Sequence, residues 1–169
     1  MSEKSVDNLI GIEAAKKIKE LVEHARTCLM MTSLINRPIE IRPMAIQKVG
    51  DDGRIYFFSH KDSGKNAELQ ISGEMQLTIS NDGNSEYLSL YGKADVYRDQ
   101  KEINEMYSAF ANVWFEGKED PNLTIIRFTP EDGHYWDSKH GKLVQMVGIL
   151  FGAITGKQTD DGLQGQLKP

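Results

Sequence analysis

A short polar segment, residues 59–66, has the composition of an anion-binding loop. It reads Ser-His-Lys-Asp-Ser-Gly-Lys-Asn and follows a short apolar run. We expect a helix to begin near Ser63, and the unpaired backbone N–H groups at a helix start attract an anion. Ser59 and Ser63 would add hydroxyl donors, and Lys65 would add a positive charge. The alternative is that Ser63 only caps the helix and that Lys65 is solvated, and the segment by itself leaves both interpretations open.

A second candidate is the tripeptide Arg42-Pro43-Met44. On a strand, Arg42 and Met44 point to the same face. Pro43 lacks an N–H, which indicates a sheet edge or a bulge that a ligand can approach. An arginine between apolar residues needs an acceptor for its guanidinium group. That acceptor is either a bound ligand or a carboxylate such as Glu40 or Glu86.

Two adjacent aromatic residues, Tyr135 and Trp136, stand near a predicted strand end. Such side chains usually belong to a core or an interface, and the alternative is that they stack on a ligand. The single cysteine, Cys28, lies in an apolar run and has no partner for an intramolecular disulfide. We interpret Cys28 as a buried structural thiol in a reducing compartment.

Several common kinds of site have no support in the sequence. The four histidines form no His-Glu-x-x-His motif, and one cysteine is too few for a zinc box, so we expect no metal site. There is no Gly-x-Ser-x-Gly hydrolase motif and no Gly-x-Gly-x-x-Gly dinucleotide motif. Residues 59–66 also fail as a Walker A motif, because Ser59 replaces its first glycine and Asn66 its final Ser or Thr. The catalytic residues, if any, stay unknown.

Composition narrows the class of protein further. Twenty Lys and Arg against 25 Asp and Glu give a net charge of −5, which argues against a nucleic-acid-binding protein. Residues 1–11 lack the apolar core of a secretory signal. The longest apolar stretch, residues 143–154, is interrupted and too short to span a bilayer. We therefore expect a cytoplasmic protein without a membrane partner.

Hydrophobic periodicity predicts the elements that position these residues. It indicates a helix at residues 12–27, a short helix at 65–71, and a third helix capped by Asp99. The buried stripe of the third helix is expected to be Ile103, Met106, Tyr107 and Phe110. Strands are expected at residues 28–35, 39–49, 54–59, 75–81, 86–97 and 123–129, with a hairpin turn at residues 50–53 and a last hairpin returning through residues 134–136.

These elements favour a mainly β fold. The strands do not alternate with helices as in a doubly wound α/β protein. A closed or half-closed Greek-key barrel protects the strand edges best, so we predict a six-stranded antiparallel barrel with flanking helices. At 169 residues the chain suits one domain, residues 1–155, followed by a flexible tail at residues 156–169.

Together, several short motifs resemble the pyridoxamine 5'-phosphate oxidase-like family of FMN-binding split barrels, in its general stress protein branch. The motifs occur in the family's order: Arg42-Pro43-Met44, Tyr56-Phe57-Phe58-Ser59, Ser63-Gly64-Lys65, Tyr91-Gly92, Trp114-Phe115 and Tyr135-Trp136-Asp137. The resemblance covers roughly residues 12–147. It implies a homodimer of split barrels with one flavin, FMN or alternatively FAD, in each of two grooves at the subunit interface.

The resemblance also implies roles for individual residues. Arg42 and Met44 would line the flavin ring, and Ser63 and Lys65 would bind the FMN phosphate. Phe58 and Ser59 match an aromatic-hydroxyl pair at the end of the third strand. Trp136 matches an aromatic residue that reaches the flavin of the partner subunit.

The chain departs from the oxidase at positions that matter for activity. Gly64 stands where the oxidase has a phosphate-binding Arg, Gln47 where it has a substrate-contacting Lys, and Tyr87 where it has a flavin-contacting Gln. Lys142, Val144 and Met146 stand where the oxidase has an Arg-x-His-x-Arg pattern. We therefore expect a protein that does not oxidise vitamin B6.

Three functions remain open. The first is a flavin-dependent oxidoreductase with an unidentified small-molecule redox partner. The second is a non-catalytic protein that binds and buffers flavin. The third is a dimeric interaction module without cofactor.

Overall fold

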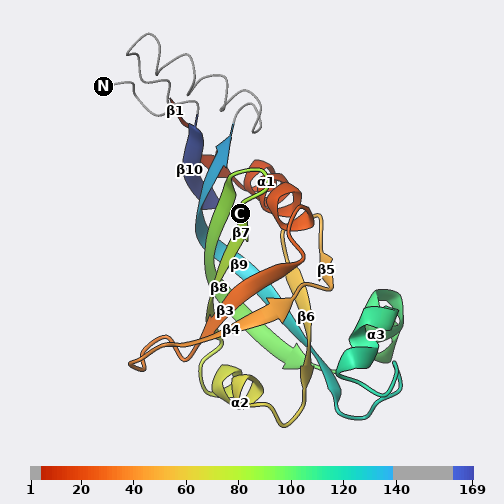
Figure 1. Cartoon of the computed structure of the whole chain (residues 1–169). Coiled ribbons are helices and arrows are strands. Elements are labelled where there is room, and N and C mark those ends of the chain that lie inside the picture. The colour runs from red at the N-terminus through yellow and green to blue at the C-terminus, as the bar shows by residue number, and fades with distance from the viewer. Residues whose placement is uncertain (1–4, 139–161) are drawn as a thin grey trace.

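The computed structural model describes residues 5–138 and 162–169 as a curved β-sheet with three short α-helices around it (Figure 1). The helices are α1 (Ile12–Glu23), α2 (Gly64–Ile71), α3 (Gln100–Met106) and the 3-10 helix η1 (Ala109–Val113). The strands are β1 (Ser5–Val6), β2 (Leu9–Ile10), β3 (Thr27–Thr32), β4 (Glu40–Ala45), β5 (Lys48–Val49), β6 (Ile55–His60), β7 (Glu74–Asn81), β8 (Glu86–Tyr97), β9 (Leu123–Ser138) and β10 (Gly162–Lys168).

The sheet follows the order β1-β10-β9-β8-β7-β3-β4, and β6 joins it through β9. Strand β9 is its centre, because it pairs with β8 along most of its length, with β6 at one end and with β10 at the other. All these pairs are antiparallel, whereas β1 and β2 run parallel to β10. The mainly β fold is thus confirmed, with ten strands instead of six because the sheet gains β10 and three strands of two residues each.

The barrel closes at a corner between β4 and β5. The N–H of Ile46 donates to the carbonyl of Arg26, and the next N–H, of Gln47, donates to the carbonyl of Tyr56. The chain therefore leaves one strand partner and joins another at this point, and this divides the predicted strand 39–49 into two. Beside the corner, β4 and β6 border a split in the barrel, because no pairing joins them.

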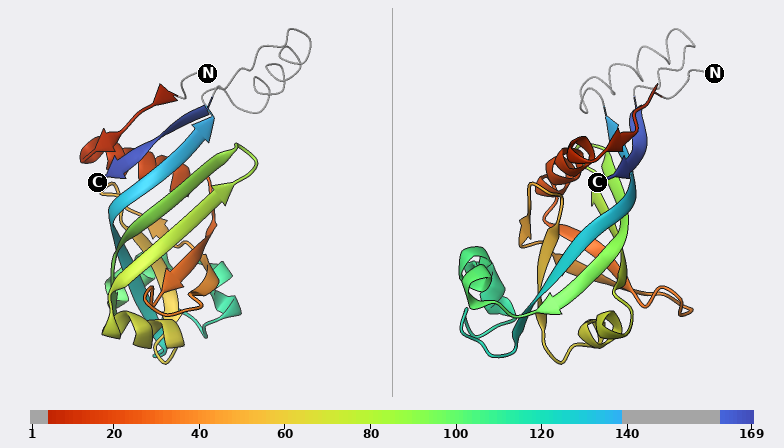
Figure 2. Two further views of the ribbon diagram at one scale, coloured as in Figure 1. Left: turned by 90° about the vertical axis from the view of Figure 1, so that its left-hand side faces the viewer. Right: turned by 180° about the vertical axis from the view of Figure 1, so that it is seen from behind.

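Two hydrophobic clusters fill the structure. The larger lies inside the barrel and includes Ile18, Phe57, Leu77 and Leu90, and α1 covers it with its apolar face. The smaller joins β6 and β9 to the α3 and η1 segment through Phe58, Ile103, Met106, Ala111, Phe115, Leu123 and Ile125. Both α2 and α3 lie at the opposite end of the barrel from α1 (Figure 2).

Most predicted elements are confirmed, including the hairpin turn at residues 50–53, the strand 86–97 and the cap at Asp99, which accepts a hydrogen bond from the Glu102 N–H at 2.9 Å. The predicted helix 12–27 instead ends at Glu23, because the backbone from Thr27 pairs with β4. Phe110 was wrongly expected in the buried stripe. It is 59% exposed, since α3 ends at Met106 and the chain changes to a 3-10 helix.

The predicted last hairpin is wrong, because β9 is one continuous strand of 16 residues. A register shift against β8 at Tyr91 and Gly92 bends it. A Cβ on Gly92 would lie 2.1 Å from the carbonyl oxygen of Thr129, so the bend depends on the missing side chain. The bend lets the two ends of β9 pair with different strands.

The C-terminal residues 162–168, expected to be a flexible tail, form β10 and pair with β9. Leu167 is fully buried, which gives this segment a place in the core. The rest of the expected tail, residues 156–161, lies outside the described residues, as do Lys142, Val144 and Met146. Within the described part of the chain, no helix is both long and apolar enough to cross a membrane.

Candidate functional site

The split between β4 and β6 contains a cavity of about 370 Å³, which we call the split cavity. Five of the seven predicted site residues line it: Arg42, Met44, Phe58, Ser59 and Lys65. Its other lining residues are Pro43, Ala45, Gln47, His60, Ala111, Trp114 and Phe115. The topology thus brings together residues of β4, β6, the start of α2 and the η1 segment. Of these, Ala111 was not singled out in the sequence, and Trp114 and Phe115 had no role assigned.

Helix α2 begins at the lower end of β6, and Ser63 occupies its N-cap position. The Ser63 N–H donates to the carbonyl of His60, and the Ser63 carbonyl accepts from the N–H groups of Asn66 and Ala67. Its side chain makes no capping hydrogen bond, and its Oγ is buried without a partner among the described residues. Ser63 is thus the N-cap residue, as one interpretation expects, but its hydroxyl does not make the capping hydrogen bond.

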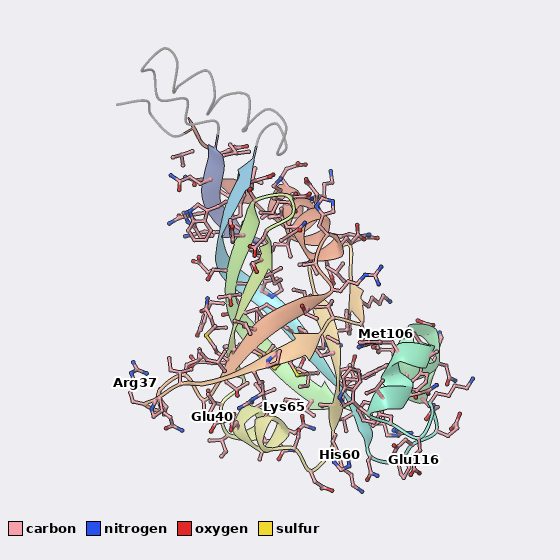
Figure 3. All side chains as sticks on the ribbon, viewed as in Figure 1. Arg37, Glu40, His60, Lys65, Met106 and Glu116 are labelled. Atoms are coloured by element: carbon pink, nitrogen blue, oxygen red, sulfur yellow. The ribbon has the colours of Figure 1, made fainter. Side chains whose placement is uncertain are left out.

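Lys65 lies in the first turn of α2 (Figure 3) and is partly buried. Among the described residues its ammonium group makes no ion pair or hydrogen bond, and the backbone N–H groups of Gly64 and Lys65 also have no partner. Burial lowers the pKa of Lys65, the charge of Arg42 lowers it further, and the charge of Glu68 partly offsets both. A buried hydroxyl, two free amides and an unpaired ammonium group at a helix start form an anion-binding arrangement.

The guanidinium group of Arg42 is already bound by three side chains. It donates to Thr32 Oγ1 at 2.8 Å, to Glu40 Oε2 at 2.9 Å, and from both terminal nitrogens to Glu68 Oε2 at 3.3 Å. The hydroxyl of Thr32 also donates to Glu68. Glu40 is thus confirmed as a partner of Arg42. Glu68 was not predicted as a partner, although its position one helical turn after Gly64 is a sequence signal that could have indicated it.

The expectation that Glu86 is an alternative partner of Arg42 is wrong. Glu86 accepts a hydrogen bond from Asn81 at 2.9 Å and contacts His24 Nδ1 at 3.0 Å. Glu86 therefore connects the β7–β8 hairpin to the end of α1. It does not contact Arg42, because β8 starts far from the split cavity.

Phe58 and Ser59 connect the split cavity to the core. The ring of Phe58 packs edge-on against Phe115, with ring centroids 6.2 Å apart. Ser59 Oγ lies 2.7 Å from Thr124 Oγ1, and the Thr124 hydroxyl donates its proton to the Ser59 carbonyl at 2.9 Å. The Ser59 hydroxyl must then donate its own proton to Thr124. Toward any other group, Ser59 Oγ can therefore act only as a hydrogen-bond acceptor. Thr124 was not predicted, because it lies on β9, far along the chain.

Trp136 lies in a different cavity, of about 630 Å³, on the outer face of the sheet. We call it the face cavity, and its lining residues are Thr27, Cys28, Leu29, Pro43, Thr78, Ile79, Ser80, Tyr87, Leu88, Ser89 and Trp136. Strand register puts Ser80, Tyr87 and Trp136 in one row across β7, β8 and β9. Pro43 borders both cavities, so β4 separates them.

Two residues at or next to the face cavity, Tyr135 and Cys28, are buried in the core, as the sequence indicates. Tyr135 is fully buried, and its hydroxyl donates to the Asp7 carbonyl at 2.8 Å. Cys28 is buried as predicted, and burial raises the pKa of its thiol to about 12. Trp136, in contrast, is 40% exposed, and its ring centroid lies 4.5 Å from that of His134, with the two ring planes tilted by 50°.

Comparisons with known proteins agree with this architecture. The family model for "Pyridoxamine 5'-phosphate oxidase like" proteins matches residues 13–160. Protein bli-3 of Neurospora crassa is 24% identical over 112 residues, which cover 61% of this chain and 54% of bli-3. The chain therefore spans about half the length of that relative.

Two solved structures share the fold. A protein assigned as general stress protein 26 from Jannaschia sp. CCS1 superposes with a TM-score of 0.78 at 23% identity, over 92% of this chain and 98% of that one. The general stress FMN/FAD binding protein from Xanthomonas citri superposes with a TM-score of 0.62 at 24% identity, over 79% and 92% of the two chains. The motif order, the split barrel and the family match over residues 13–160 show that this chain belongs to the pyridoxamine 5'-phosphate oxidase-like family.

Proposed function

We propose that this chain is a flavoprotein that binds FMN in the split cavity. The phosphate group would lie at the start of α2, bound by Ser63 and Lys65, and the flavin ring would lie against Arg42 and Met44. The observation that carries the proposal is the buried Ser63 hydroxyl, which together with the nearby Lys65 ammonium group has no partner in the described part of the chain. A charged phosphate oxygen would satisfy both groups.

The lining of the split cavity also suits the rest of a flavin. Its volume of about 370 Å³ is within the usual range for small-molecule sites. Phe58, Ala111, Trp114 and Phe115 form apolar walls for a planar ring, and Arg42 supplies a polar edge. FAD is the alternative flavin, because a protein of similar fold is named an FMN/FAD binding protein.

Bound FMN would supply one- and two-electron redox chemistry, and the residues of this chain would bind and orient it. Arg42 would stabilise negative charge at the polar edge of the ring, while Glu40 and Glu68 hold its guanidinium group in position. The apolar walls would exclude water from one face of the ring. The resulting activity is that of a flavin-dependent oxidoreductase acting on a small-molecule redox partner, and a cytoplasmic location stays a prediction.

A non-catalytic flavin-binding protein is the second candidate, and the composition of the cavity favours it. His60 is the one histidine among the described residues that line the cavity, and its ring is exposed and accepts from the Asp62 N–H at 3.3 Å. Anaerobic reduction of the flavin-loaded protein separates the two candidates. An enzyme passes electrons to an acceptor faster than free FMN does, whereas a buffering protein slows the transfer.

We further propose that two copies of the chain complete each site. The predicted ring-stacking residue Trp136 lies across β4 from the split cavity of its own chain. The face cavity is bordered by the exposed apolar side chains of Leu29, Tyr87 and Trp136, which are 46%, 43% and 40% exposed. In a homodimer this face would cover the partner's split cavity. A monomer in sedimentation at micromolar concentration would contradict the shared site.

The proposed function is tested by the visible spectrum of the purified protein and by titration with FMN. A flavin absorption envelope, or saturable quenching of flavin fluorescence, is the expected result. Absence of both colour and uptake would contradict the proposal and favour the interaction module without cofactor. Riboflavin, which lacks the phosphate, is the matched ligand that isolates the contribution of Ser63 and Lys65.

A further inference from the structure

Glu68 lies where it faces the proposed anion site. It is on α2, one turn after the first residue of that helix, and a Cβ on Gly64 would lie 3.9 Å from Glu68 Oε1. Its other oxygen, Oε2, accepts from Arg42 and Thr32. The side chain is 24% exposed, so water screens its charge only in part.

The two positive side chains at the split cavity, Arg42 and Lys65, differ in whether carboxylates form ion pairs with them. Arg42 is 20% exposed and stands between two carboxylates, those of Glu40 and Glu68. Lys65 makes no ion pair among the described residues, yet it senses the charge of Glu68, which raises its pKa against the larger effect of burial. The site therefore offers an anion one uncompensated positive charge and, beside it, one negative charge.

We propose that Glu68 is a specificity-determining residue of this site, which weakens phosphate binding and keeps the flavin exchangeable. The inference rests on the proposed function. Glu68 acts in two ways: it neutralises Arg42, and it repels the doubly charged phosphate of FMN across the first turn of α2. A turn of helix rises only about 5.4 Å, so two charges one turn apart repel each other effectively.

The alternative role of Glu68 is purely structural, since it connects β3, β4 and α2 through Thr32 and Arg42. The two roles predict opposite effects of Glu68→Gln. Glutamine keeps an acceptor oxygen for Arg42 and Thr32 but removes the charge. If Glu68 only held Arg42 in place, the substitution would leave FMN binding unchanged or weaken it. If its charge opposes the phosphate, the substitution strengthens FMN binding.

The experiment compares the affinities of FMN and riboflavin for the full-length wild-type and variant proteins by fluorescence titration at low salt. Glu68→Gln is expected to tighten FMN binding about fivefold and to slow FMN dissociation, with less than about a twofold change for riboflavin. Glu13→Gln is the matched control, because it removes the same charge from a 68% exposed carboxylate that pairs with Lys16 on α1, at the opposite end of the barrel from α2 (Figure 2). It should change the affinity for either ligand less than about twofold.

A second variant guards against a folding defect in Glu68→Gln. Gly64→Arg adds a positive charge on the same helix face, and the nearest side-chain atom of the described residues to the new Cβ is Glu68 Oε1, at 3.9 Å. It should also raise the ratio of FMN to riboflavin affinity. An unchanged or lowered ratio in Glu68→Gln, with a melting temperature that matches the wild type, would overturn the role of Glu68. Failure of the wild type to bind FMN would instead overturn the proposed function and this inference with it.

Discussion

The two cavities on either side of β4 differ in chemical character. The split cavity is lined by Arg42, His60 and Lys65 and ends at a helix start. The face cavity is larger, its described lining residues include no charged side chain, and it combines Tyr87 and Trp136 with small hydroxyl side chains. The split cavity therefore suits the anionic end of a ligand, and the face cavity suits a planar part of a ligand. A ligand with both features would need both cavities, which a single chain presents on opposite sides of one strand.

The largest effect that tests this difference is expected from Lys65→Ala. Loss of a charge-assisted phosphate contact should weaken FMN binding about ten- to a hundredfold, whereas riboflavin binding should stay within about twofold. Fluorescence titration of both flavins gives the two constants. Equal losses for the two ligands would mean that Lys65 supports the cavity and does not bind phosphate.

Trp136→Ala tests the face cavity. If the indole ring stacks on the flavin of a partner subunit, FMN and riboflavin should both bind about tenfold more weakly. Because Trp136 and Lys65 would belong to different subunits at one site, mixing the two single variants is informative. After subunit exchange, half of the dimers carry one unmutated site, so about a quarter of all sites should recover FMN binding. No recovery would mean that each site lies within one chain.

The face cavity should also be chemically inert at Cys28, whose thiol pKa burial raises from 9.0 to about 12. Between these values the unfolded chain loses the thiol proton while the folded chain keeps it. The free energy of unfolding should therefore fall as pH rises from about 9 to about 12. Denaturant unfolding of wild type and Cys28→Ala across this range isolates the effect, because the other groups titrate in both proteins. Parallel pH profiles would show that Cys28 does not contribute.

The smallest effect is expected at Lys19, which pairs with Asp51 at the surface, away from both cavities. Lys19→Ala should change flavin affinity by less than about twofold and leave the melting temperature nearly unchanged. Thermal unfolding and one FMN titration check both values. A larger effect on FMN binding would show that the two cavities are coupled to the α1 end of the barrel.

Local sequence patterns predicted most elements because their causes are local. The Asp99 cap needs only the N–H of Glu102, three residues away, and the hairpin at residues 50–53 closes on itself through Gly50 and Arg54. Ser63 and Lys65 were grouped in one predicted anion loop for the same reason, since they lie within one helical turn. Errors occurred where a distant partner decides the conformation. The predicted helix 12–27 stops early because Thr27 pairs with Ala45, and residues 162–168 form a strand because β9 offers them a free edge.

The sequence by itself determined the family, the mainly β fold and five residues that line one cavity. Only the tertiary structure decided how the charges are paired. It brings Glu68 to Arg42, 26 residues apart, and Thr124 to Ser59, 65 residues apart. It also puts Trp136 across β4 from the split cavity. The physical reason is that helix periods, caps and turns depend on residues that are neighbours in the sequence. The pairing of side chains across a curved sheet instead depends on strand order and register. Both form only when the whole barrel is assembled.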